Sequence, residues 1–245
     1  MLLVDVLLPL NSLSGVQYLG AWAEIVQDLE KLHKHGFLHR DISSATLMYR
    51  KSDGRIQGVL TDFDLATSSH VNYLPHLLHR TGTTPFLAYE LLSSFEYVPH
   101  LFRRDLESAL YVLIWDAVDN VTPEASAANK CLRTWLDPTM SGSAKGSLCT
   151  CLREPTLPIG RGISLGELDP IKILLVRIAS QIVLGYGQLF AWYAFSPEKL
   201  RTELEGEEKK DWEDLWGYFV PEVMVQKFQD LKQAFPQPHQ CEPNG

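Results

Sequence analysis

The sequence predicts a mainly α-helical fold that carries one small β-hairpin. Apolar residues recur at three- and four-residue steps over Gln17–His35, the spacing that gives an amphipathic helix one buried face. After its first turn, the stretch Asp105–Val118 is almost wholly apolar, so we expect a second helix in the centre of the domain. Between these helices, the β-prone runs 47–50 and 55–60 flank an Asp53-Gly54 pair, which favours a tight hairpin turn.

The remaining elements follow from composition and from helix and turn signals. Ser14 is a candidate cap for the first helix, and Gly36 ends it. The other expected elements are a strand over Leu2–Leu8, a long irregular loop between 66 and 87, a short helix over Tyr89–Phe95, and helices over Asp169–Leu184 and Pro221–Phe235. We therefore expect a core at 1–118, a loop-rich insertion at 119–166, a C-terminal helical part at 167–235 and a frayed tail at 236–245.

Composition and charge narrow the class of protein. The 245 residues are 45% apolar and 21% charged, which is ordinary for a soluble globular chain. A net charge of -8, with no run of lysine or arginine, argues against a nucleic-acid partner. The apolar stretch 171–195 carries Lys172, Arg177 and two glycines, which favours a buried helix broken near Gly185 and Gly187 over a membrane span.

The cysteines and the N-terminus bear on the compartment. The four cysteines match neither a zinc pattern nor a dense disulfide framework, which favours reduced intracellular thiols. The first ten residues are apolar, but they lack a basic leader and Asp5 interrupts them, unlike a secretory signal. We therefore expect an intracellular protein of the cytoplasm or nucleus.

Two loops carry the residues that could take part in a chemical reaction. His39–Thr46 follows the first helix and contains Asp41, while Thr61–Ala66 follows the hairpin and contains Asp62. Taken alone, an aspartate after a helix or strand is most often a turn or cap residue. Two carboxylates at the mouth of one hairpin suit phosphoryl transfer, in which one acid orients a hydroxyl and another holds the metal on the phosphates.

These loops, with two further motifs, resemble the C-terminal lobe of the fungal-type protein kinase family. The matching stretches occur in the family's order and spacing: His39-Arg40-Asp41-Ile42-Ser43, Asp62-Phe63-Asp64-Leu65-Ala66, Gly82-Thr83-Thr84-Pro85-Phe86-Leu87-Ala88-Tyr89-Glu90-Leu91 and Arg104-Asp105-Leu106-Glu107-Ser108. The resemblance covers residues 1–118 well and the remainder loosely. It implies a kinase-like C-terminal lobe, a truncated form of the family's α+β fold, and a serine/threonine phosphotransferase that uses ATP and Mg²⁺ on a protein substrate.

The resemblance also assigns roles to residues of the site. Asp41 corresponds to the catalytic aspartate, Asp62 to the metal-binding aspartate, and Thr83 to a threonine that contacts the catalytic aspartate. Arg40 would pair with a phosphorylated residue, and Met48 would face the adenine. The candidate phosphosites are Thr67, Ser68, Ser69 and Thr81, and the supporting residues are His39, Glu90 and Asp105.

The sequence departs from the family pattern at three points. Ser43 occupies the position where many protein kinases place a lysine, although the fungal-type family also has serine there. Thr46 stands where an asparagine would ligate the second metal, and its hydroxyl is a shorter ligand. No Gly-rich phosphate loop and no strand lysine with its helical glutamate are present, so we expect the N-terminal lobe to be missing and activity to be impaired.

Three functional hypotheses remain open on these residues. The chain is a fragment or truncated gene model of a serine/threonine kinase, a pseudokinase that binds partner proteins or acts as a scaffold, or a non-functional remnant. The missing lobe favours the second and third, while Asp41, Asp62 and Thr83 favour kinase descent. The sequence does not identify the arginine that would pair with Glu90.

Overall fold

The computed structural model describes residues 6–69, 81–92, 100–118, 132–137, 139–147, 157–158, 164–165, 170–195 and 212–234. Within these ranges the chain is mostly helical and carries small antiparallel sheets, as the sequence predicts. Two predicted elements lie partly outside the described residues, namely the strand over Leu2–Leu8 and the helix over Tyr89–Phe95. Most of the loop between 66 and 87, the cysteines and the tail from 236 to 245 also lie outside them.

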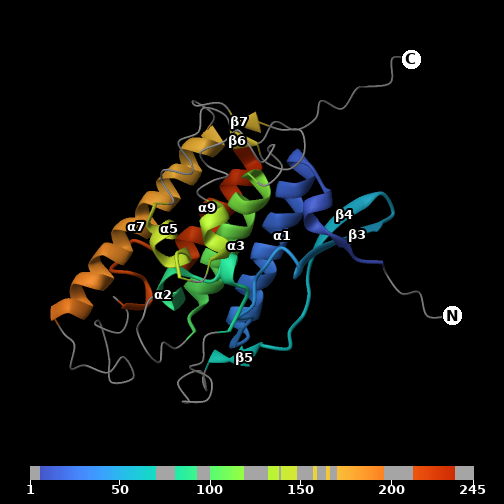
Figure 1. The fold of residues 1–245 in the computed structure, drawn as a ribbon. Coiled ribbons are helices and arrows are strands. Elements are labelled where there is room, and N and C mark those ends of the chain that lie inside the picture. Colours follow the sequence, from blue (N-terminus) through green and yellow to red (C-terminus); the bar gives the residue numbers. More distant parts are fainter. Residues whose placement is uncertain are drawn as a thin grey trace.

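Three helices form the centre of the fold (Figure 1): α1 (Gly15–Lys34), α3 (Phe102–Val118) and α9 (Pro221–Ala234). Trp22 of α1 is fully buried, donates its indole N–H to the carbonyl of Ala109 at 3.1 Å and meets the ring of Phe228 edge to face at 5.2 Å. The helix α3 is buried along its length, because helices cover it on several sides. The prediction of a central apolar helix is confirmed, with its start three residues earlier than expected.

The hairpin packs on the side of α1 that faces away from α7 (Figure 1). It consists of β3 (Leu47–Ser52) and β4 (Arg55–Leu60), paired in register from Leu47↔Leu60 to Ser52↔Arg55, and β1 (Leu8–Pro9) lies along the other edge of β3. The predicted turn at Asp53-Gly54 has positive φ at both residues. A Cβ atom at Gly58 would overlap the carbonyl oxygen of Ala21, so glycine allows β4 to lie close against α1.

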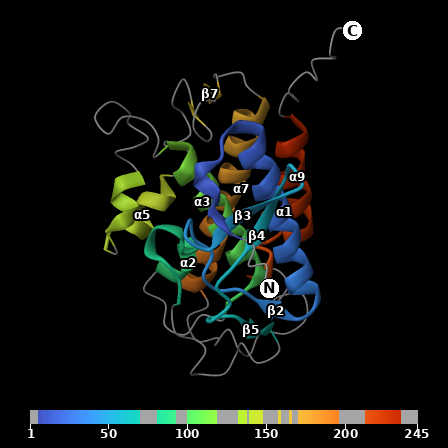
Figure 2. The same cartoon turned by 90° about the vertical axis from the view of Figure 1, so that its right-hand side faces the viewer.

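Short elements surround this core. The described ones are the 3₁₀ turns η1 (Leu10–Ser12), η4 (Thr84–Phe86) and η5 (Thr134–Leu136), the helices α2 (Tyr89–Leu92) and α5 (Ser141–Gly146), and the strand pairs β2 (Phe37–Leu38) with β5 (Thr67–Ser68) and β6 (Leu157–Pro158) with β7 (Ser164–Leu165). Figure 2 places α5 and α2 on the side of the molecule away from α1 and α9. The predicted insertion at 119–166 thus contributes at least one packed helix, α5.

The helix α7 (Pro170–Phe195) corrects one prediction, because it runs without a break through both of its glycines. A Cβ atom at Gly185 would lie 2.8 Å from the Cβ of Leu215, so the glycine admits a neighbouring segment and tertiary packing overrides its low helix propensity. Over Lys172–Trp192 this helix is long and apolar enough to cross a membrane by length and composition alone. Core helices of soluble proteins pass the same test, and Ile178, Ile182 and Leu189 are buried here.

Candidate active site

One buried carboxylate on α3, that of Asp105, holds the start of the loop 39–46 through hydrogen bonds. The backbone N–H of His39 donates to Asp105 Oδ2 at 2.8 Å, and the N–H of Arg40 donates to Asp105 Oδ1 at 3.0 Å. The ring of His100 contacts the same carboxylate at 2.8 Å. Although burial alone would raise the pKa of Asp105, His100 and the His39 N–H hold it below its ordinary value. An ionised carboxylate therefore fixes the start of the loop.

His39 joins the two candidate loops. Its Nδ1 faces the N–H of Asp41 at 3.3 Å and its Nε2 faces the carbonyl of Thr61 at 3.0 Å. Because an amide N–H can only donate and a carbonyl can only accept, these partners assign the ring proton to Nε2. The ring also packs at 5.0 Å from the ring of Phe63, which is half exposed. The imidazole thus sets the position of Asp41 relative to the second loop.

Asp41 and Thr83 are brought together across 42 positions of sequence. Asp41 Oδ1 accepts a hydrogen bond from the backbone N–H of Thr83 at 3.0 Å and another from its hydroxyl at 3.1 Å. Two donors on one oxygen fix the rotamer of the carboxylate. This is the contact that the resemblance implies for these two residues.

Two residues of the loops have left-handed backbone. The φ angle is 72° at Arg40 and 61° at Asp62, a region in which residues other than glycine are uncommon. Such strain costs on the order of 1–3 kcal/mol per residue and persists where the surroundings enforce it, often at functional sites. At Arg40 the enforcing contact is the Asp105 carboxylate. The side chain of Asp62 is exposed to solvent.

Thr46 and Ser43 hold the end of the first loop. The Thr46 hydroxyl donates toward the carbonyls of Asp41 and Ser43, each at 3.1 Å, and accepts the Ser43 N–H at 2.9 Å. The Ser43 hydroxyl accepts the N–H of Ala45 at 3.2 Å, and both side chains are buried. In this geometry they close a turn, and their roles toward phosphate or metal stay predictions.

A second carboxylate, which sequence reasoning missed, supports the loop from the far end of α3. Asp116 accepts the hydroxyl of Tyr18 at 2.7 Å and the hydroxyl of Ser44 at 3.2 Å. Burial, followed by the nearby Asp116 charge, raises the pKa of Tyr18 well above its ordinary value. The only signal in the sequence is an aspartate within an otherwise apolar helix.

The structure supplies the arginine partners of Glu90 that the sequence left open. Arg103 and Arg104 each place an Nη2 atom 2.6 Å from Glu90 Oε2, and all three side chains are almost completely inaccessible. The two arginines lie in the first turn of α3, directly before Asp105. The end of the segment that carries Thr83 is therefore tied to the same helix as the loop 39–46.

Met48 lies in the middle of β3, opposite Val59 of β4 and Pro9 of β1. It is half-buried, and its flanking residues Leu47 and Tyr49 are buried, so Met48 alternates to the face of the sheet away from the core. This position is compatible with the predicted adenine-facing role, which no contact tests.

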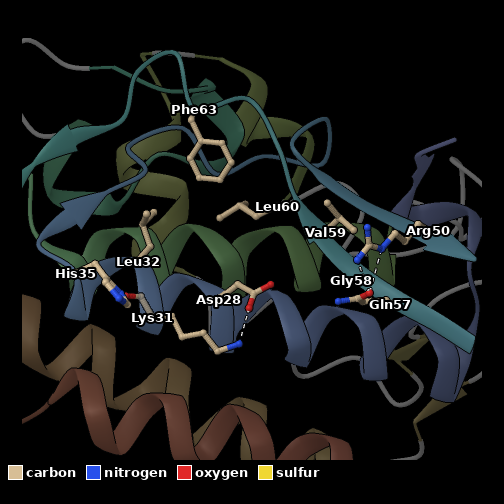
Figure 3. A pocket seen from close by; sticks show the side chains of 10 residues that line it. All are labelled: Asp28, Lys31, Leu32, His35, Arg50, Gln57, Gly58, Val59, Leu60 and Phe63. Carbon is tan, nitrogen blue, oxygen red and sulfur yellow. Dashed lines mark hydrogen bonds and ion pairs between the residues drawn. The ribbon is translucent and has the colours of Figure 1, made fainter. Parts of the chain in front are cut away.

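A cavity of about 400 Å³ runs along β4 between α1 and Phe63 (Figure 3). Leu60 and Phe63 form its apolar side, and Asp28 pairs with Lys31 at 2.8 Å at its rim. Neither Asp41 nor Asp62 lines it. The side chains of the two candidate carboxylates therefore do not contribute to this cavity.

The four candidate phosphosites fall into two environments. Thr67 and Ser68 form β5 opposite Leu38 and Phe37, and Ser69 donates its N–H to the carbonyl of Gly36 at 2.8 Å. The hydroxyl of Thr81 is buried without a hydrogen-bond partner in the part of the chain that the structure describes.

Arg40 is the residue that the resemblance pairs with a phosphorylated side chain. Burial lowers the pKa of Arg40, while the charge of Asp105 opposes this shift.

The two loops offer the carboxylates of Asp41, Asp62 and Asp64 as possible metal ligands. Within the described ranges, no group of three His, Cys, Asp or Glu side chains could hold a metal ion. Magnesium in phosphoryl-transfer sites is commonly held by one or two carboxylates together with phosphate oxygens and waters. Asp62, which is exposed, therefore fits a role as one carboxylate ligand of a magnesium ion that arrives with a phosphate-bearing ligand.

Comparison with known families agrees with this geometry. Residues 10–117 match the family model described as fungal protein kinase, a stretch that spans both loops, Thr83, Glu90 and Asp105. No curated protein matches the chain significantly. Residues 10–117 are therefore similar to the fungal protein kinase family, and the match supports a kinase-related fold for this part of the chain.

Proposed function

We propose that the chain carries the part of a serine/threonine protein kinase site that orients the substrate hydroxyl receiving the phosphate. The observation that supports this most directly is Asp41, whose Oδ1 takes both hydrogen bonds from Thr83 and leaves Oδ2 for a substrate hydroxyl. The family match at residues 10–117 supports it independently.

Asp41 would accept or orient the proton of a serine or threonine hydroxyl on a protein substrate. A positioned acid–base group of this kind typically contributes about 10²–10⁴-fold in rate. Asp105 and His39 contribute by fixing the loop, because a small displacement of the carboxylate removes its alignment with the attacking oxygen. Magnesium-bound ATP, when present, supplies the phosphoryl group and neutralises charge on its phosphates.

Asp62 is the proposed ligand of that magnesium ion, and Arg40 the proposed partner of a phosphate in the segment that leads to Thr83. Met48 would contact the base. Because the Thr46 hydroxyl is engaged inside the loop, we expect the second metal position to be weak and turnover to be low.

A second function, a pseudokinase that binds a partner protein without turnover, is favoured by the same engaged Thr46 hydroxyl. It differs from the first in lacking turnover, and in the form proposed it also does not bind nucleotide. A protein that binds magnesium-ATP is stabilised by about 2.7 kcal/mol at a ligand concentration 100 times the dissociation constant, whereas a protein that does not bind is not stabilised.

Thermal unfolding with and without magnesium-ATP distinguishes the two functions. We expect nucleotide to raise the melting temperature of the wild type and of Asp41→Asn, and to leave Asp62→Asn unshifted. Asp64→Asn, which removes an exposed carboxylate two positions away, is the matched control and should keep the shift. A wild type that magnesium-ATP does not stabilise, or an Asp62→Asn variant that keeps the full shift, would contradict the kinase proposal.

A further inference from the structure

A second cavity, of about 260 Å³, lies between α2, α3, α5 and α7, and neither loop carboxylate nor Thr83 lines it. Its walls are aromatic: the ring of Tyr89 meets the rings of Tyr186 and Phe190 edge to face, with centroids 4.9 and 5.4 Å apart. The volume lies below the range of about 300–1,000 Å³ typical of drug-sized ligands. The cavity therefore suits a small planar molecule.

One amine, that of Lys145 on α5, belongs to the lining of this cavity. The side chain is only 2% exposed, donates from Nζ to the carbonyl of Leu87 and places Nζ 4.2 Å from the ring centroid of Tyr111. Burial lowers its pKa to about 7, although Glu107 opposes the shift. A large share of this amine is therefore neutral near neutral pH.

Among the described residues, the carboxylates of Glu107 and Glu90, which belong to this cluster, already have other partners. Glu107 accepts the hydroxyls of Tyr111 at 2.5 Å and Tyr186 at 2.6 Å, and it also accepts the N–H of Tyr89 at 2.8 Å. Glu90 is paired with Arg103 and Arg104. Two carboxylates thus face two guanidinium groups, and an ammonium at Lys145 would be an additional positive charge in a buried site.

We propose that Lys145 is a nucleophilic amine that forms an imine with a small aromatic aldehyde held in this cavity. A neutral amine that donates one hydrogen to the Leu87 carbonyl keeps its lone pair for attack. The nitrogen adds to the carbonyl carbon, the carbonyl oxygen takes a proton from the amine, and the carbinolamine then loses water as the carbon–nitrogen double bond forms. The atoms balance without an oxidant or reductant, and the aromatic walls give the aldehyde ring its contacts.

Peptide mapping after reductive trapping tests the proposal. The folded chain is incubated with 2-hydroxybenzaldehyde, treated with cyanoborohydride, digested and analysed by mass spectrometry. We expect Lys145 to be labelled about tenfold or more faster than the exposed lysines Lys31 and Lys34, since a lower pKa leaves more neutral amine. The rate at Lys145 should reach half its maximum near pH 7. Labelling of Lys145 no faster than that of Lys31 would overturn the proposal.

A cavity-filling variant shows whether the aldehyde binds before it reacts. Gly187 lines the cavity, and a Cβ atom there meets no neighbour within 4 Å, so we expect Gly187→Leu to be accommodated and to fill space at the cavity. We expect this variant to label at Lys145 about tenfold more slowly, while Gly20→Leu, at an equally open position of α1, labels as the wild type does. Near-UV circular dichroism checks that both variants are folded. Unchanged labelling in a folded Gly187→Leu variant would contradict binding in this cavity.

Discussion

At the scale of single residues, Asp105 determines whether the loop 39–46 has a defined shape. Its two oxygens accept two backbone N–H groups and contact the ring of His100. An asparagine at this position would offer one carbonyl oxygen and turn an N–H₂ group toward a backbone donor. The consequence is a buried donor without a partner at the start of the loop.

We therefore expect Asp105→Asn to lower the free energy of unfolding by about 1.5–3 kcal/mol, the range for hydrogen bonds to charged groups. Urea denaturation measures this change. Asp53→Asn is the control, because Asp53 is exposed in the hairpin turn and asparagine tolerates its positive φ, so we expect a change within about 0.5 kcal/mol. Equal stabilities of the two variants would show that Asp105 does not support the loop.

At the scale of elements, α7 is the clearest case in which packing decides a glycine's role. Gly185 and Gly187 are two positions apart in one helix, yet a Cβ at Gly185 would lie 2.8 Å from the Cβ of Leu215 and one at Gly187 would meet no neighbour. Their intrinsic helix propensities are the same, so the difference between them is entirely tertiary.

Replacing each glycine by alanine should give opposite results. We expect Gly185→Ala to lower the free energy of unfolding by about 1–3 kcal/mol through overpacking against the segment 215–218. Gly187→Ala should raise it by up to about 1 kcal/mol, because alanine favours a helix more than glycine does. Chemical denaturation of both variants provides the measurement, and destabilisation of equal size at the two positions would contradict this packing of α7.

At the scale of the whole molecule, the buried amine of Lys145 makes stability depend on pH. Its pKa is about 7 in the folded chain and near the ordinary 10.5 when the chain unfolds. Below pH 7 both states bind the proton, so this group adds no slope. Between pH 7 and 10.5 only the unfolded state binds it, so the free energy of unfolding rises with pH.

We expect the wild type to gain up to about 1.4 kcal/mol per pH unit from this group between pH 7.5 and 9, and Lys145→Met to lack that gain. Urea denaturation at several pH values measures both slopes. The variant Lys34→Met removes an exposed lysine and should keep the wild-type slope. Parallel slopes for the wild type and Lys145→Met would mean that Lys145 stays protonated in the folded chain.

The sequence predicts those parts of the fold that local pattern controls. The helix at Gly15–Lys34, the hairpin and the buried helix α3 follow from periodicity and turn chemistry, and the order of the motifs places Asp41 near Thr83. The predicted break in α7 was wrong, because the residues that accept Gly185 come from a distant segment. The partners of Glu90 and the burial of Lys145 also depend on contacts between segments, which neither composition nor spacing encodes.

The account rests on Asp41 as the group that orients a protein hydroxyl, and transfer of labelled phosphate from ATP to a generic protein substrate such as casein tests it most directly. We expect the wild type to transfer label slowly in the presence of magnesium, and Asp41→Asn to transfer it about 10²–10⁴-fold more slowly while keeping its stability to urea. Transfer by Asp41→Asn at the wild-type rate, or no transfer by a wild type that magnesium-ATP stabilises, would contradict the account.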